Sequence, residues 1–132
     1  MSDMVEVVID SIRVSLMSQQ RIVILREVGN ERYLPIWIGT PEADSITIAL
    51  QEVEVARPLT HDLVKNIFTS MDARLLRVEV VALRDDTFYG NIVAEIDGRT
   101  LNIDSRPFFF TILGAISANI PKISSNLTFF NL

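Results

Sequence analysis

The sequence contains no cysteine and only one histidine, and both absences narrow the chemistry that the chain can perform. Without cysteine there is no disulfide framework, no thiolate metal site and no cysteine nucleophile. Because His61 is the sole histidine, acid–base chemistry that needs two histidines cannot occur within one chain. The sequence also lacks a glycine-rich phosphate loop, an HExxH zinc motif and a nucleophile elbow, so the enzyme classes that those motifs mark are not indicated.

Long hydrophobic runs and a targeting segment are also lacking. The longest apolar stretch, Phe108 to Ile120, is interrupted by polar residues and falls short of the ~18–20 residues that a membrane span needs. Residues 1–6 are acidic at two positions and lack the basic and apolar regions of a signal peptide. We therefore expect a cytoplasmic protein with no membrane partner.

The sequence has fewer basic than acidic residues, 12 against 17, and its formal net charge is −5. This balance argues against a broad surface that tracks nucleic-acid phosphates. The 132 residues suit one domain over 1–132. Its segment 107–132 is atypical, since it holds five of the seven phenylalanines and one charged side chain, Lys122.

Two groups of strands are predicted, over about 3–38 and about 74–104, from the alternation of apolar and polar residues. A change of parity near Asp10 and Ser11 predicts a bulge. Pro35 indicates an edge strand or a break in the ladder, and the pair Asp97-Gly98 is typical of a type I′ hairpin.

Three helices are predicted, over about 41–54, 60–71 and 109–118. Thr40 and Thr60 are the expected N-caps of the first two, and Pro41 suits the first helical position. The order of elements is three strands, two helices, three strands and one helix. It indicates an α+β fold, with helices packed on a largely antiparallel or mixed sheet.

The candidate acid–base residues lie at predicted helix starts. His61 can serve as a general base or a metal ligand beside Asp62, and free N–H groups at a helix start suit a phosphate. The alternative is a surface histidine at a helix end, with Asp62 complementing the helix dipole. Glu42 lies in the first turn of the preceding helix. It can take part in a site, or it can simply complement the dipole of that helix.

Two arginines and three aromatic residues are the candidate substrate contacts. Arg57 and Arg106 each precede a proline, which holds the backbone extended and can aim both at one phosphate. The alternative is an ion pair with one of the carboxylates. Trp37, Phe88 and Tyr89 lie in predicted strands, where core packing is the commoner outcome and stacking on bases is the functional one. The neighbouring pair Asp85-Asp86 indicates a turn and only weakly a divalent-metal site.

Four short segments together resemble the bifunctional nuclease domain family, in order and spacing, over about residues 1–107. The first is Tyr33–Gly39 (YLPIWIG) followed by Glu42-Ala43. The others are Arg57–Leu63 (RPLTHDL), Thr87–Gly90 (TFYG) and Asp104–Pro107 (DSRP). Beyond Pro107 the family continues with Ser-Asp-Ala and a helix that ends in arginine, whereas this chain continues with a phenylalanine-rich stretch.

The resemblance implies an α+β domain with nuclease activity on RNA and DNA, and it carries over Glu42, Thr60, His61, Asp62 and Arg106 as site residues. The first hypothesis is therefore a metal-assisted phosphodiesterase. In it, a divalent ion (Mg or Mn) is held by Glu42, Asp62 and Asp104, with His61 as base or ligand. Arg57, Thr60, Tyr89 and Arg106 contact the substrate.

A second hypothesis is a non-catalytic, homo-oligomeric domain, with a dimer favoured, that binds a ligand or a partner. The acidic charge and the loss of the family's Ser-Asp pair favour it. An uncharged, phenylalanine-rich helix after Pro107 is expected to enter the core or a subunit interface.

Overall fold

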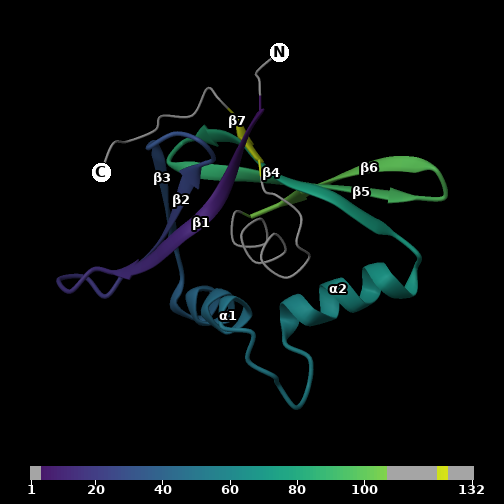
Figure 1. Cartoon of the computed structure of the whole chain (residues 1–132), viewed down its shortest axis with the longest axis horizontal. Helices are drawn as coiled ribbons and strands as arrows, with labels where there is room; N and C mark the ends of the chain where they lie inside the picture. Colours follow the sequence, from purple (N-terminus) through teal and green to yellow (C-terminus); the bar gives the residue numbers. More distant parts are fainter. Residues whose placement is uncertain (1–3, 107–121, 125–132) are drawn as a thin grey trace.

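The computed structural model describes residues 4–106 and, for the backbone alone, residues 122–124. These residues form seven strands and two helices (Figure 1). The strands are β1 (Met4–Val14), β2 (Arg21–Glu27), β3 (Tyr33–Ile38), β4 (Arg74–Arg84), β5 (Thr87–Ile96), β6 (Arg99–Ser105) and β7 (Lys122–Ser124), and the helices are α1 (Thr40–Leu50) and α2 (Thr60–Ser70).

The described strands form one sheet in the order β3-β2-β1-β7-β4-β5-β6. β1, β2 and β3 make an antiparallel unit, and β4, β5 and β6 make a second one. The short β7 lies between them, antiparallel to β1 and parallel to β4, so the whole sheet is mixed. Both helices lie on the same side of the strands (Figure 1). The predicted α+β class with two strand groups is confirmed, while the predicted helix over about 109–118 lies outside the described residues.

Three local features of the strands agree with the sequence. The β1–β2 register shifts between Ile9 and Ser11, which confirms the bulge. Pro35 lies in β3, an edge strand of the described sheet, where a missing N–H is tolerated. Asp97 and Gly98 have φ values of 51° and 75°, as the type I′ turn between β5 and β6 requires.

The predicted N-caps are wrong by one residue. α1 begins at Thr40 with Gly39 in the N-cap position and no side-chain cap, and α2 begins at Thr60 after Leu59. In α2 the carboxylate of Asp62 accepts a hydrogen bond from the Leu59 N–H (2.9 Å). A carboxylate at the third helical position can reach back in this way, so the start of α2 does not depend on a threonine oxygen.

α1 ends at Leu50, before the predicted end at residue 54. Glu52 has a φ of 53°, and the N–H groups of Glu52 and Val53 donate to the carbonyls of Ala49 and Ile48. This is a Schellman arrangement, which usually has glycine at the position of positive φ. Because that position is a glutamate here, the local sequence carries no clear signal for the end of the helix.

Neither described helix is long and apolar enough to cross a membrane. Each has 11 residues, and each instead lies on the sheet.

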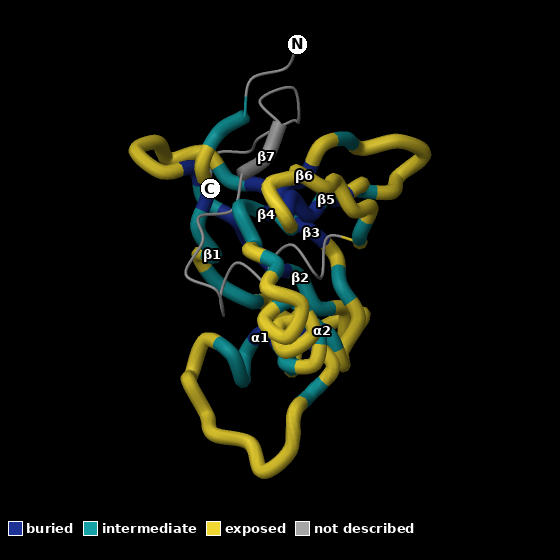
Figure 2. Tube along the Cα trace, turned by 90° about the vertical axis from the view of Figure 1, so that its right-hand side faces the viewer, coloured by how far each residue is buried: buried dark blue, intermediate teal, exposed yellow. Residues whose placement is uncertain are grey.

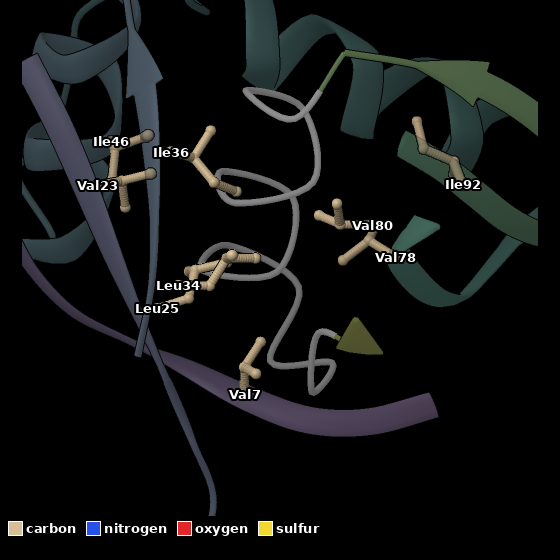
Figure 3. Packing of buried hydrophobic residues seen from close by; sticks show 9 residues of the cluster. All are labelled: Val7, Val23, Leu25, Leu34, Ile36, Ile46, Val78, Val80 and Ile92. Atoms are coloured by element: carbon tan, nitrogen blue, oxygen red, sulfur yellow. The ribbon is translucent and has the colours of Figure 1, made fainter. Parts of the chain in front are cut away.

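One hydrophobic cluster joins the two strand units. Six of its buried residues come from β1, β2, β3 and α1, and three come from β4 and β5 (Figure 3). Buried positions gather in the strands, whereas the connecting loops are mainly exposed (Figure 2). The cluster comprises Val7, Val23, Leu25, Leu34, Ile36, Ile46, Val78, Val80 and Ile92.

A buried carboxylate closes the turn between β2 and β3. Glu27, at the end of β2, is 7% exposed, and its Oε2 accepts a 2.6 Å hydrogen bond from Arg32 Nε. This bond lowers the pKa of Glu27 below its usual value of 4.5, although burial acts in the opposite direction. The ion pair thereby spans the turn, where Gly29 adopts a φ of 83°.

Ile46 tests how far the core depends on α1, because its side chain is fully buried. We expect Ile46→Ala to lower the free energy of unfolding by about 2–5 kcal/mol, since it removes buried methyl groups and leaves a cavity. Urea denaturation measures this. Leu16→Ala is the control: Leu16 is 88% exposed, and we expect a change within about 0.5 kcal/mol. Equal stability of the two variants would show that α1 is not part of the core.

Candidate functional site

A pocket of about 590 Å³ lies between α2, the first residues of β5 and the last residues of β6. α2 contributes Val64 and Phe68 to its wall. Tyr89 lines it from β5, Asp104 lines it from β6, and Arg106 lines it from the residue just beyond Ser105. The pocket therefore joins residues of two of the sequence motifs with an apolar helix face.

A second pocket of about 370 Å³ adjoins the first. It is lined by Glu42 from α1, by Asp86 from the β4–β5 turn and by Arg106. Thr87, Phe88 and Arg106 line both pockets, so the two hollows meet at Arg106. Glu42 thus lines one pocket, Tyr89 and Asp104 line its neighbour, and Arg106 lines both.

Gly90 determines how closely β6 approaches β5 beside Arg106. It pairs with Ser105 in the antiparallel register. A Cβ at Gly90 would lie 2.9 Å from the Ser105 backbone oxygen and 3.4 Å from the Arg106 backbone oxygen. Only glycine allows this approach without a backbone shift. The TFYG segment thus contributes to the site partly through the space that Gly90 leaves.

Glu42 lies over the start of α1. Its carboxylate occupies the space beside Gly39, such that a Cβ at Gly39 would overlap Glu42 Oε2. Glu42 is in the first turn of the helix, where a negative charge is stabilised by the helix dipole. The absence of a side chain at Gly39 therefore lets this carboxylate fold back at the wall of the second pocket.

His61 and Asp62 form the first turn of α2 but do not line these two pockets. His61 is only 2% exposed, and its Nδ1 has no hydrogen-bond partner among the described residues. Its Nε2 lies 3.5 Å from Asp62 Oδ1, and Asp62 Oδ2 accepts the N–H of Leu59. The interpretation of His61 as a surface histidine is therefore wrong, while Asp62 stabilises the helix start.

His61 lies on the same face of α2 as two residues that line the first pocket. His61, Val64 and Phe68 are spaced i, i+3 and i+7, so they share one helix face. Val64 and Phe68 line the pocket, and His61 lies one turn further toward the N-terminus. The histidine is thus packed on the side of the helix that forms the pocket wall.

The other residues predicted to contact substrate do not all line the two pockets. Arg57 and Thr60 are exposed and do not line either pocket. Phe88 packs against the core, as expected, but Trp37 is 56% exposed and lines the second pocket, so core packing was the wrong prediction for it. Trp37 follows the buried Ile36 in β3, so its side chain points to the opposite face of the sheet, which leaves it exposed.

The predicted metal ligands are spread over different parts of the described structure. Nowhere in the described part of the chain do three His, Asp or Glu side chains gather closely enough to hold a metal ion. Glu42 and Asp104 line different pockets, and Asp62 is engaged at the start of α2. The predicted ligands Glu42, Asp62 and Asp104 thus do not form one three-residue cluster. A Mg or Mn ion held by one or two of these carboxylates together with a substrate phosphate stays a prediction.

Asp86 is a pocket residue that the sequence assigned mainly to a turn. Asp85 and Asp86 do form the β4–β5 turn, with φ values of 50° and 60°. The turn also brings Asp86 to the second pocket, opposite Arg106. The signal that marks it is its position immediately before the TFYG segment.

Comparison with known proteins agrees with the segments identified above. A family model of the bifunctional nuclease domain matches residues 23–120. The matched span extends past the expected limit near residue 107, so part of the phenylalanine-rich stretch falls within it. Two uncharacterised proteins of Mycobacterium tuberculosis, from strains CDC 1551 / Oshkosh and ATCC 25618 / H37Rv, are each 39% identical over 102 residues. That region is 77% of this chain but only 60% of each relative.

Gly90 and Gly39 make a matched test of how the site is positioned. Gly90→Ala pushes against backbone, so we expect it to lower the free energy of unfolding by about 1–3 kcal/mol and to displace Arg106. Gly39→Ala meets only the flexible end of Glu42, so we expect a loss below about 1 kcal/mol together with movement of that carboxylate. Urea denaturation and NMR chemical shifts measure both. The close approach of β5 and β6 would be disproved by a Gly90→Ala protein as stable as wild type.

Proposed function

The chain belongs to the bifunctional nuclease domain family, and on that premise we propose that it hydrolyses phosphodiester bonds in RNA and DNA at the contiguous pockets around Arg106. The two relatives are uncharacterised, and the chain spans about three fifths of their length. The activity, the substrates and a cytoplasmic location are therefore proposals for this protein.

The observation that carries the proposal is the position of Arg106 where the two pockets meet. A planar guanidinium can bind two oxygens of one phosphate, and Arg106 lies with carboxylates on either side, Glu42 and Asp86 in one pocket and Asp104 in the other. One cation flanked by acids suits a small catalytic site. It does not require the broad basic surface that the net charge of −5 argues against.

In the proposed reaction, each side chain has a defined task. Arg106 binds two non-bridging oxygens of the scissile phosphate and neutralises the charge that develops there. Glu42 accepts a proton from the attacking water. The hydroxyl oxygen bonds to phosphorus as the bond to the leaving oxygen breaks, and the leaving oxygen takes a proton from solvent.

Aromatic stacking and the α2 wall orient the substrate. Tyr89 is 38% exposed and lines the first pocket, where its ring can stack on a base. His61 is buried one turn from Val64 on α2 and does not line the pocket, so we assign it a positioning role through α2 and not contact with the phosphate. Arg57 and Thr60 stay predicted substrate contacts for a longer nucleic acid.

Cleavage of single-stranded RNA and DNA tests the proposed function. We expect Arg106→Gln to lower the rate by about 10²–10³-fold, because it removes a charged donor from the phosphate. Glu42→Gln removes the base and is expected to lower the rate by about 10²–10⁴-fold. Parallel reactions with and without EDTA test the predicted Mg or Mn requirement separately.

Two exposed charges provide the controls for this assay. Arg99→Gln and Glu31→Gln make the same changes in charge, and neither residue lines the two pockets. We expect both controls to cleave at the wild-type rate. Wild-type cleavage by Arg106→Gln and Glu42→Gln would refute the site, and a wild-type chain without cleavage of either polymer would refute the function.

The alternative function is a non-catalytic homodimeric domain, and one feature of α2 favours it. Leu63, Ile67 and Met71 are spaced i, i+4 and i+8 and are 53%, 46% and 56% exposed. They form a second apolar stripe beside the one that packs on the sheet. Such a stripe suits the self-complementary contact of a dimer.

Light scattering tests this alternative. A dimer has twice the chain mass of 14.9 kDa, and the double variant Leu63→Lys/Ile67→Lys is expected to give the monomer mass, because it places like charges on the facing stripes of both copies. A wild-type chain that is monomeric across the concentrations used for the cleavage assay would exclude the dimer.

A further inference from the structure

The face of β4, β5 and β6 that points away from the core carries a polar pocket of about 380 Å³. Its lining includes Arg84, Tyr89, Asn91, Asn102 and Asp104. The register places Asn91 directly opposite Asp104, and directly opposed residues share a face of the sheet. Because Tyr89 and Asp104 also line the pocket at Arg106, this outer pocket adjoins the proposed nuclease site.

A chain of hydrogen bonds crosses this face from β4 to β6. Arg77 Nε donates to Glu79 Oε2 (2.7 Å). Asn91 Nδ2 donates to Glu79 Oε1 (2.9 Å) and to Asn102 Oδ1 (3.0 Å). Glu79 is only 7% exposed, and a buried carboxylate needs such donors. The bonds therefore hold three strands in register through one buried charge.

This chain also determines which way the two amides point. A carboxylate only accepts hydrogen bonds, so Asn91 must turn its nitrogen toward Glu79. The same nitrogen then donates to Asn102, which must turn its oxygen inward and its Nδ2 group outward. Asn102 Nδ2 donates no hydrogen bond to any other described residue, so its hydrogens are available to a ligand.

Beside that donor lies an unused acceptor. Asp104 is two residues along β6 from Asn102, so the two side chains share a face. The Asp104 carboxylate makes no hydrogen bond or ion pair to another described residue. The guanidinium of Arg84 lies 5.4 Å from the centroid of the Tyr89 ring at the same pocket. The pocket thus combines an amide donor, a carboxylate that has no partner among the described residues, and a planar cation–aromatic pair.

We propose that this outer pocket binds the guanine base of a substrate nucleotide. The edge of guanine presents two adjacent N–H donors, N1–H and N2–H, next to the O6 acceptor. Asp104 would accept from both donors and Asn102 Nδ2 would donate to O6. Adenine, cytosine and uracil lack two adjacent donors on that edge, so the carboxylate discriminates among the bases.

Two further features favour a nucleotide in the outer pocket: surfaces on which its base can stack, and residues shared with the pocket at Arg106. The base lies against the Tyr89 ring or the Arg84 guanidinium, and both are surfaces on which bases stack. Tyr89 and Asp104 line both pockets, so a nucleotide seated here directs its phosphate toward Arg106. The choice of a nucleotide ligand rests on the proposed nuclease function, and the choice of guanine rests on Asn102 and Asp104.

Calorimetric titration of the full chain with GMP, IMP, AMP, CMP and UMP tests the site without requiring cleavage. We expect GMP to bind at least about tenfold more tightly than AMP, CMP or UMP, as good bidentate base contacts do. IMP lacks the N2 amine, so its affinity should fall between those of GMP and AMP. Equal binding of all five nucleotides, or no binding of GMP, would overturn the proposal.

Two variants with a matched control locate the recognition. Asp104→Asn removes the carboxylate that would accept both guanine N–H groups. Asn102→Asp keeps an oxygen that accepts from Asn91, but it replaces the outward-facing Nδ2 donor by a second oxygen. We expect each to weaken GMP binding about tenfold. Asp97→Asn makes the same charge change as Asp104→Asn in the type I′ turn, which tolerates asparagine, and should leave GMP binding unchanged. Retention of the GMP preference by both pocket variants would refute the assignment.

The guanine-pocket proposal and the nuclease proposal can be refuted independently. A chain that prefers GMP but cleaves neither RNA nor DNA would refute the nuclease function and support the guanine pocket. A chain that cleaves a uridine oligomer carrying a single guanosine equally at every position, with no nucleotide preference in calorimetry, would refute the guanine pocket alone.

Discussion

The rest of the structure depends on one hydrophobic core shared by two three-stranded units. A sheet of three strands with one apolar face needs something to cover that face, and here both units contribute buried side chains to the same cluster. Ile36 comes from the first unit and Ile46 from α1, while Val78 and Ile92 come from the second unit. The second pocket spans the same boundary, so the site depends on the docking that the core produces.

The two faces of β4, β5 and β6 have different roles: one packs into the hydrophobic core, and the other carries the polar outer pocket. Val78 and Val80 are fully buried in the core, whereas Glu79 between them faces the other way into a chain of hydrogen bonds. Burying that carboxylate is tolerable because Arg77 and Asn91 satisfy both of its oxygens. The same bonds orient Asn102 outward. Tyr89 and Asp104 line both the pocket at Arg106 and the outer pocket, and so connect the two.

Much of the fold could be predicted from the sequence, because strands and tight turns depend on neighbours in the chain. The bulge near Ser11 and the Asp97–Gly98 turn have local causes. The end of α1 was missed because a glutamate, Glu52, takes the positive φ that glycine usually takes. The exposure of Trp37 was missed because alternation alone does not say which face of an edge strand is covered.

For the site, the sequence by itself determined the family and the chemistry of the candidate side chains. It singled out Glu42, His61 and Arg106 because each lies in a recognisable segment, and it excluded thiol chemistry. Only the tertiary structure decided which of these side chains meet. Glu42 and Arg106 line one pocket through the docking of distant elements, while His61 is buried and does not line that pocket. The physical reason is that side-chain chemistry is a property of the residue, whereas convergence depends on long-range packing and strand register, which local sequence does not encode.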